Sequence, residues 1–421
     1  MAGKDDILIK VGAEMDRSLA EVIAYTIREL RKIEQKHRDV QSATKKHNRA
    51  VKQAEKTIRR YSEQLRTMNG HLRQAGNLIE TKLLYGFAAA SAAITAFGAS
   101  TVKTGAEFEQ SMINVGAIAN LTSGQVDRLS KRARQLGAST AYTATEVANG
   151  MGDLARAGLD VVKIMGAIEP TLYLAGAAGA DMSVATKMMA RTFAQFNLQA
   201  KDAATVADVF TVAMQNSLLD IESLDTSMRY AGAGAGAFGM DIKDTTAAVA
   251  LFMDQTGLGS TAGTQFRHVL LSLAGPTARA EEVMGRLAKM HNKLNGTTSE
   301  TAKTIKDKLN PANSSFKEII ETLIPVMNDN EAILALVNKR ASGSLQKIIK
   351  DFASGSSKYE GLVRKMDLQV GQARKTYLRQ INSVMGQAKI LRSKIEETQL
   401  AIFDTFKVNF KEFVTGIGGA F

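Results

Sequence analysis

The chain has 421 residues, of which 45% are hydrophobic and 23% are charged, a composition typical of folded proteins and a length sufficient for more than one domain. It contains no cysteine, which excludes disulfides, zinc–thiolate sites and a cysteine nucleophile. The net charge of +12 divides into +7 over residues 1–82, −3 over residues 83–276 and +8 over residues 277–421. The two basic segments are either solvated helix faces or surfaces for an acidic neighbour.

Residues 1–82 form a basic arm whose apolar positions recur at alternating spacings of three and four from residue 19 to residue 79. This repeat predicts a coiled-coil helix about 90 Å long. Leu, Ile and Val share the seam, which favours a homo-oligomer of three or more chains, a trimer first and a hexamer as the alternative. A long helix packed against its own chain is the other interpretation. The predicted core positions are Ile23, Leu30, Val51, Ile58, Tyr61, Leu65, Met68, Leu72 and Ile79.

Residues 83–102 carry no charge and lie between Lys82 and Lys103. About twenty uncharged residues suffice for a helix to cross a bilayer. Ala, Gly, Ser and Thr dominate the segment, however, and small residues equally suit close contact between helices. We expect a packed helix that acts as a hinge between the arm and the next domain, and entry into a membrane is the other hypothesis for this segment. The residues that would face lipid are Leu83, Leu84, Phe87, Ile94, Phe97 and Val102.

The pattern of residues 103–277 predicts an all-α domain with a core of small residues. A capping box, Thr143 with Glu146, predicts a helix that ends near Gly158. Asp181 is the expected cap of another helix. Further helices are predicted over residues 123–137, 201–216, 221–235, 242–256 and 261–274.

Residues 278–421 form a basic helical region. Ser315 and Glu318 make a second capping box, and Pro325 should kink or end the helix that they open. Two long helices are predicted over residues 330–354 and 359–414. Along the second, apolar residues recur at helical spacing: Val370, Ala373, Tyr377, Ile381, Val384, Ala388, Leu391 and Ile395.

No set of residues predicts a catalytic, cofactor or metal site. The five histidines have no ligand spacing between them. The glycine run at residues 230–241 lacks the preceding strand and the Lys-Ser/Thr that hold a phosphate and its magnesium. Basic residues are not interleaved with aromatic ones, so we expect no sequence-specific binding of nucleic acid. The sequence therefore predicts a protein that is not an enzyme and needs no cofactor.

Several blocks in the middle of the chain resemble, in order, the shared domain of phage tail tape measure proteins over about residues 102–277. They include FEQSMINVGAIA from Phe108, LGASTAYTATEVANGMGDLARAG from Leu136, LYLAGAAGADMSVATKMMARTFAQFNL from Leu172 and YAGAGAGAFGMDIKDTTAAVALFMDQTG from Tyr230. FKEIIETLIPVMNDNEAILALVNKRASGSLQKIIKDF from Phe316 is similar to the usual continuation of that domain.

The resemblance implies a structural protein of a phage tail or tail-like particle. Such a protein lies inside the tail tube or at its tip, sets tube length during assembly and leaves ahead of DNA at infection. The implied partners are further copies of the chain, tail tube and tip or hub proteins, tail assembly chaperones, and the host membrane at infection. Residues 1–30 contain no uninterrupted apolar core, so we expect synthesis in the host cytoplasm without a secretory signal. A membrane-active, pore-forming delivery protein of the same particle is the alternative.

Overall fold

The computed structural model describes residues 100–418 except residue 356, and helices connected by short turns make up this part, with no β-strand in it. The prediction of an all-α fold is confirmed. The basic arm over residues 1–82 and residues 83–99 of the apolar segment lie outside the described residues. Their coiled-coil and membrane assignments therefore stay predictions.

The chain forms two compact units. The larger unit comprises residues 107–397, and the smaller one comprises residues 1–106 and 398–421. In the smaller unit, the hydroxyl of Thr104 donates a hydrogen bond of 3.2 Å to Gln399. The ring of Phe403 lies so close to Gly105 that a Cβ there would come within 2.0 Å of it. The division of the chain at residue 277, between the regions of residues 103–277 and 278–421, stays a prediction.

The larger unit begins within a helix over residues 100–118 and continues as a series of short helices. Its first half contains α5 (Ser123–Ser139), α6 (Ala144–Arg156), α7 (Val161–Ala178), α8 (Met182–Phe196), η1 (Ala200–Asp202), α9 (Ala203–Asn216), α10 (Ile221–Ala237), α11 (Ile242–Thr256) and α12 (Gly259–Ala274). The second half contains α13 (Ala278–Asn295), α14 (Ala302–Leu309), α15 (Phe316–Leu323), η2 (Ile324–Val326), α16 (Asn330–Leu336), α17 (Lys339–Ala353), α18 (Lys358–Leu368), α19 (Gln372–Gln380) and the first part of α20 (Val384–Gly418).

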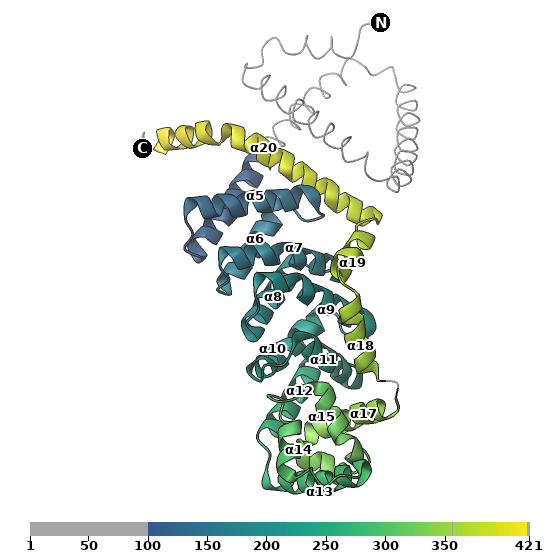
Figure 1. Cartoon of the computed structure of the whole chain (residues 1–421). Coiled ribbons are helices and arrows are strands. Elements are labelled where there is room, and N and C mark those ends of the chain that lie inside the picture. The colour runs from purple at the N-terminus through teal and green to yellow at the C-terminus, as the bar shows by residue number, and fades with distance from the viewer. Residues whose placement is uncertain (1–99, 356, 419–421) are drawn as a thin grey trace, which may run out of the picture. The chain divides into compact units, whose positions relative to one another are not determined.

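Within the larger unit the helices from α5 to α13 follow one another along one direction, and α18 and α19 return beside them (Figure 1). Contacts run from α5 to α6, from α6 to α8, from α8 to α10 and from α10 to α12. α12 in turn contacts α14 and α17. Helices encoded before and after residue 277 thus share one apolar core.

Local sequence signals set several helix ends as predicted. The Thr143 hydroxyl accepts a hydrogen bond of 3.2 Å from the backbone N–H of Glu146, whose carboxylate accepts one of 2.9 Å from the N–H of Thr143. Ser315 and Glu318 make the same reciprocal pair at the start of α15. Pro325 lies in the 3-10 turn η2 that follows α15, so this helix does end there.

Residues 230–237 of the glycine run form the second half of α10, and glycines permit close packing on two sides of this helix. A Cβ at Gly236 would lie 1.9 Å from the carbonyl oxygen of Gln195 in α8. On the opposite side, glycines of α12 lie against the α10 backbone, and a Cβ at Gly263 would lie 2.3 Å from the Ser227 carbonyl oxygen. The absence of a side chain lets these backbones approach, which explains the small-residue core.

Two expectations about helix extent are corrected, and one helix was not predicted. The predicted helix over residues 330–354 is two helices, because Val337 is extended and Asn338 caps α17. The predicted helix over residues 359–414 is three helices, α18, α19 and α20, with Gly371 in the left-handed region at φ +77°. α7 was not among the predicted helices, although Asp160 caps it by accepting from the Lys163 N–H at 2.8 Å.

Candidate functional site

The residues predicted to carry function lie almost entirely outside the described part of the chain. None of the nine predicted coiled-coil core residues falls within residues 100–418. Of the predicted membrane-facing residues only Val102 is described, in a helix, with 36% of its surface exposed. The functional assessment of the described part therefore rests on features that the sequence did not single out.

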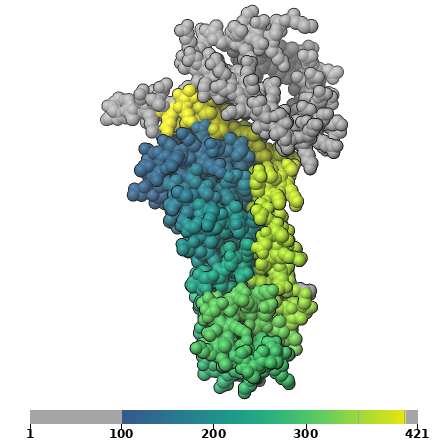
Figure 2. Space-filling view, in the orientation of Figure 1, coloured from purple at the N-terminus to yellow at the C-terminus, as the bar shows by residue number. Residues whose placement is uncertain are grey.

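The most distinctive of these is a return segment, residues 358–397, which we call the strap. It comprises α18, α19 and the first turns of α20, and it runs back beside helices encoded 100 to 260 residues earlier (Figures 1 and 2). α18 contacts α11 and α9, and α19 contacts α9 and α7. Along the strap, contact therefore passes from α11 to α9 to α7, the reverse of the order of these helices in the chain.

Asp208 on α9 fastens the middle of the strap. Its carboxylate accepts hydrogen bonds from the backbone N–H of Gly371 at 2.6 Å and of Ala373 at 2.9 Å. Gly371 is the N-cap of α19 and has no side chain to bond the first N–H groups of that helix. Asp208, only 7% exposed, takes this role from another helix. No local pattern around residue 371 could have indicated this partner.

Tyr377 fastens the strap one helical turn further on. Its hydroxyl accepts a hydrogen bond of 2.8 Å from the backbone N–H of Ala141, in the turn before α6. Its ring lies against Gly176 of α7, where a Cβ would come within 2.2 Å of the ring. The Tyr173 ring completes the contact at a centroid distance of 5.4 Å. Burial raises the pKa of Tyr377, so the hydroxyl stays neutral at physiological pH.

Tyr359 fastens the start of the strap to α11. Its hydroxyl donates a hydrogen bond of 2.8 Å to the carboxylate of Asp244. Burial, with the nearby charges of Asp241, Glu318 and Asp367, raises the pKa of Asp244 above its usual 3.8 despite that hydrogen bond. The folded chain therefore holds this proton more tightly than the unfolded chain does. Ionisation of Asp244 consequently lowers the free energy of unfolding as the pH rises above 3.8.

Three polar contacts fasten the start of α20. The Ser393 hydroxyl donates to the carbonyl oxygens of Gly137 and Tyr142, the second at 3.0 Å. The Glu396 carboxylate accepts from the backbone N–H of Thr145 at 2.8 Å. Several hydrogen bonds thus join side chains of the strap to backbone groups at the ends of earlier helices. Because those backbone groups are fixed, the bonds hold the strap at one position along the helix series.

Two adjoining pockets of about 320 and 140 Å³ lie beside the start of α20, the larger against α6 and α8 and the smaller against α7 and α19. Tyr142 and Lys389 line both, and the larger one adds the carboxylates of Glu146 and Asp153. Glu146 belongs to the capping box, and Asp153 pairs with Arg156 at 2.7 Å. These carboxylates therefore serve the helix structure. Among the described residues no three His, Asp or Glu side chains gather as a metal site would require.

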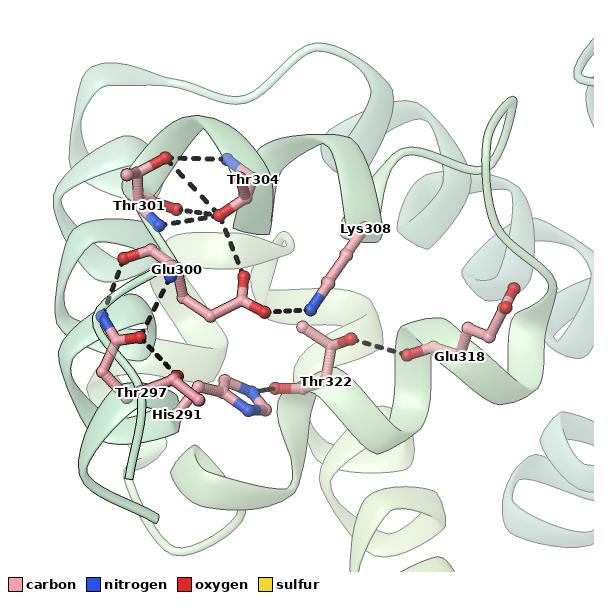
Figure 3. Close-up of polar contacts among 9 residues, drawn as sticks. His291, Thr297, Glu300, Thr301, Thr304, Lys308, Glu318 and Thr322 are labelled. Atoms are coloured by element: carbon pink, nitrogen blue, oxygen red, sulfur yellow. Dashed lines mark hydrogen bonds and ion pairs between the residues drawn. The ribbon is translucent and has the colours of Figure 1, made fainter. Parts of the chain in front are cut away.

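A second polar cluster joins α13, α14 and α15 (Figure 3). Glu300 accepts from the Thr304 hydroxyl at 2.9 Å and pairs with Lys308, which holds the pKa of Glu300 below its usual value. An imidazole nitrogen of His291 lies 2.9 Å from the Thr322 carbonyl oxygen. These bonds pair the polar groups of a loop and of two helix ends. They place no nucleophile beside a base.

Within residues 100–418, one helix, α7, is long and apolar enough to cross a membrane, with a mean hydropathy of 1.2. It contains Pro170, and its residues Ile164, Ile168 and Leu172 are fully buried. Contacts with α6, α8, α9 and α19 surround it. We therefore interpret α7 as a core helix of the larger unit.

The chain matches the family model described as phage-related minor tail protein over residues 130–351, slightly more than half of its length. The chain belongs to this family. The match begins in α5 and ends in α17, so it contains most of the helix series against which the strap folds. The resemblance noted in the sequence is thereby confirmed, and the minor tail protein is a structural component of a phage tail.

Three relatives of the minor tail protein carry more specific names. It is 35% identical over 200 residues to the tape measure protein of Pneumococcus phage Dp-1, covering 48% of this chain and 17% of that protein. It is 27% identical over 289 residues to the probable tape measure protein of Escherichia phage P2, covering 67% and 35%. It is 22% identical over 398 residues to that of Clostridium phage phiCD119, covering 90% and 39%. The minor tail protein thus spans well under half the length of these relatives, and no solved structure matches it.

Proposed function

We propose that this minor tail protein is a tape measure protein, or the corresponding segment of one, in a phage tail or tail-like particle. It lies inside the tail tube or tip, sets tube length during assembly and is released ahead of DNA at infection. The observation that carries the proposal is the family match over residues 130–351 together with relatives named tape measure protein or probable tape measure protein.

The physical basis of the ruler is helix length. A helix advances about 1.5 Å per residue, so a continuous heptad arm converts residue number into distance. We place the measuring length in the arm of residues 1–82, whose repeat also supports association of several copies. Its net charge of +7 suits an acidic inner wall of the tube. Tube, tip or hub proteins and assembly chaperones are the proposed partners.

Deleting residues 51–64 tests the ruler. This removes two whole heptads and leaves Leu65 in the register that Val51 occupied, so the coiled-coil seam stays continuous. Tails assembled with the deleted chain should be shorter by about 20 Å, because fourteen helical residues are lost. Electron microscopy of purified tails, averaged over many particles, measures the change.

The matched control duplicates residues 51–64, which should lengthen the tails by the same amount. Tails of unchanged length in both variants would show that the arm does not set tail length. Tails that change length in only one direction would indicate an assembly defect instead of measurement.

The alternative function is a membrane-active, pore-forming delivery protein, favoured by the uncharged segment of residues 83–102. Inserting two aspartates beside Ala92 should abolish leakage from anionic liposomes if this segment enters lipid, since buried charges are costly there. The same insertion beside Thr298, an exposed position in the loop between α13 and α14, is the control. Leakage that survives the insertion beside Ala92 would count against the alternative.

A further inference from the structure

The side of the strap that faces away from the helix series is both basic and apolar. Residues 368–395 contain six Lys or Arg and no Asp or Glu. All six cations are exposed, although Lys389 and Arg392 also line the larger pocket beside α6 and α8, where Arg392 lies 3.7 Å from the Glu146 carboxylate. Exposed large apolar side chains accompany them, among them Val384 at 90% and Val370 at 75%. We call this surface the outer strap face, and its apolar members are Leu368, Val370, Leu378, Val384, Met385, Leu391 and Ile395.

The apolar residues on α20 have the spacing of a helix-packing seam. Val384, Ala388, Leu391 and Ile395 follow one another at intervals of four, three and four, and all are exposed. Such a stripe lies along one side of a helix and accepts the ridge of a second helix. The opposite side of the same turns carries Ser393, which is buried and bonded to Gly137 and Tyr142. Within the described residues α20 is therefore held by one side, and the seam is uncovered.

Charge selects the kind of partner. A second copy of this chain would bring the same acid-free, basic surface, and like charges across an interface oppose association. A helix with Asp and Glu beside its apolar residues would meet Arg379 and the other exposed cations of this surface with opposite charge. A lipid surface could also attract the cations, but a membrane-bound amphipathic helix buries a broad apolar face, whereas this stripe is only as wide as a coiled-coil seam. The narrow stripe favours a helical partner over lipid.

We propose that the outer strap face docks an amphipathic helix of another protein whose apolar seam is flanked by acidic residues. This is an interaction surface, and it holds whether or not the chain sets tail length. The apolar residues of the partner pack on Val384, Leu391 and Ile395, and its carboxylates lie beside the cations on α19 and α20. Both contributions matter, because the apolar contact supplies affinity and the charges supply orientation and partner choice.

The test uses the full chain and two labelled synthetic helical peptides of 28 residues. Both have leucine at the a and d positions of four heptads, one with Glu and the other with Lys at the e and g positions. Fluorescence anisotropy should show binding of the Glu peptide, weakened by added salt, and no binding of the Lys peptide. The double substitution Val384→Asp/Leu391→Asp should weaken binding of the Glu peptide at least tenfold.

Charge reversal and a remote control complete the design. Arg379→Glu/Lys389→Glu should reduce binding of the Glu peptide and raise that of the Lys peptide. Leu294→Asp changes an equally exposed apolar residue, 71% exposed on α13, and should leave binding unchanged. Circular dichroism of each variant confirms that the fold is intact.

Three results would overturn the proposal. The first is no binding of the Glu peptide, or binding that the double substitution on α20 leaves unchanged. The second is cosedimentation of the chain with phosphatidylserine vesicles, lost in the double variant, without peptide binding, which would assign the face to lipid. The third is self-association in sedimentation experiments that the double variant abolishes, which would assign the face to a second copy.

Discussion

Replacing Gly263 by alanine should lower the free energy of unfolding of the chain by about 2–3 kcal/mol, because the added methyl group overpacks the contact between α10 and α12. The atoms nearest to that methyl group would all be backbone atoms of Ser227, the closest at 2.3 Å. A flexible side chain could move aside, whereas here two helices would have to separate. Urea denaturation of the full chain, followed by circular dichroism, measures the change in stability.

The matched control makes the same substitution at Gly343 in α17. That glycine is exposed, and a Cβ there would have no neighbour within 4 Å. Alanine loses less backbone entropy than glycine on entering a helix, so Gly343→Ala should stabilise the chain by about 0.5–1 kcal/mol. Equal effects at the two positions would mean that close backbone approach is not what Gly263 provides.

Replacing Asp208 by alanine should release the strap and lower the free energy of unfolding by about 2–3 kcal/mol, since it removes the acceptor of two backbone N–H groups in a buried place. The bonds to Gly371 at 2.6 Å and Ala373 at 2.9 Å are the ones lost. Hydrogen exchange at residues 371–380 should accelerate markedly, because α19 then begins without a capping group. Asp208→Asn retains one acceptor oxygen and should have a smaller effect on both measurements.

Asp160 supplies the control for this prediction. It too accepts a backbone N–H, that of Lys163 at 2.8 Å, but it is exposed and lies at the start of α7. Asp160→Ala should cost about 1 kcal/mol, as for other N-cap losses, and leave hydrogen exchange in α19 unchanged. If both aspartate variants accelerated hydrogen exchange in α19 equally, the change would reflect the lower global stability and not the loss of the Asp208 contact.

The helical series was predictable where its signals are local. The Thr143–Glu146 and Ser315–Glu318 boxes and the proline at residue 325 each act over three or four residues, and the structure contains all of them as expected. The coiled-coil seam of the arm and the apolar segment of residues 83–102 rest on equally local patterns. They remain predictions because residues 1–99 lie outside the described part of the chain.

The strap was not predictable, because its path depends on partners remote in sequence. Helical spacing continues from Val370 to Ile395, so the pattern alone indicated one unbroken helix. The break at Gly371 is stabilised by Asp208, 163 residues earlier in the chain. The same pattern could not distinguish Tyr377, which is buried, from Val384, which is 90% exposed. Which apolar side chains are covered is a property of the packing.

The sequence by itself determined the all-α class, most helix ends and the family, since capping and periodicity act within a few residues and ordered blocks of residues identify the family. Only the tertiary structure decided that residues 278–397 join the earlier helices in one unit and that the strap returns beside them. It also decided that, among the described residues, the strap leaves a basic, apolar face uncovered. The physical reason is that buried hydrogen-bond acceptors and glycine contacts select one path among several that local propensity allows equally.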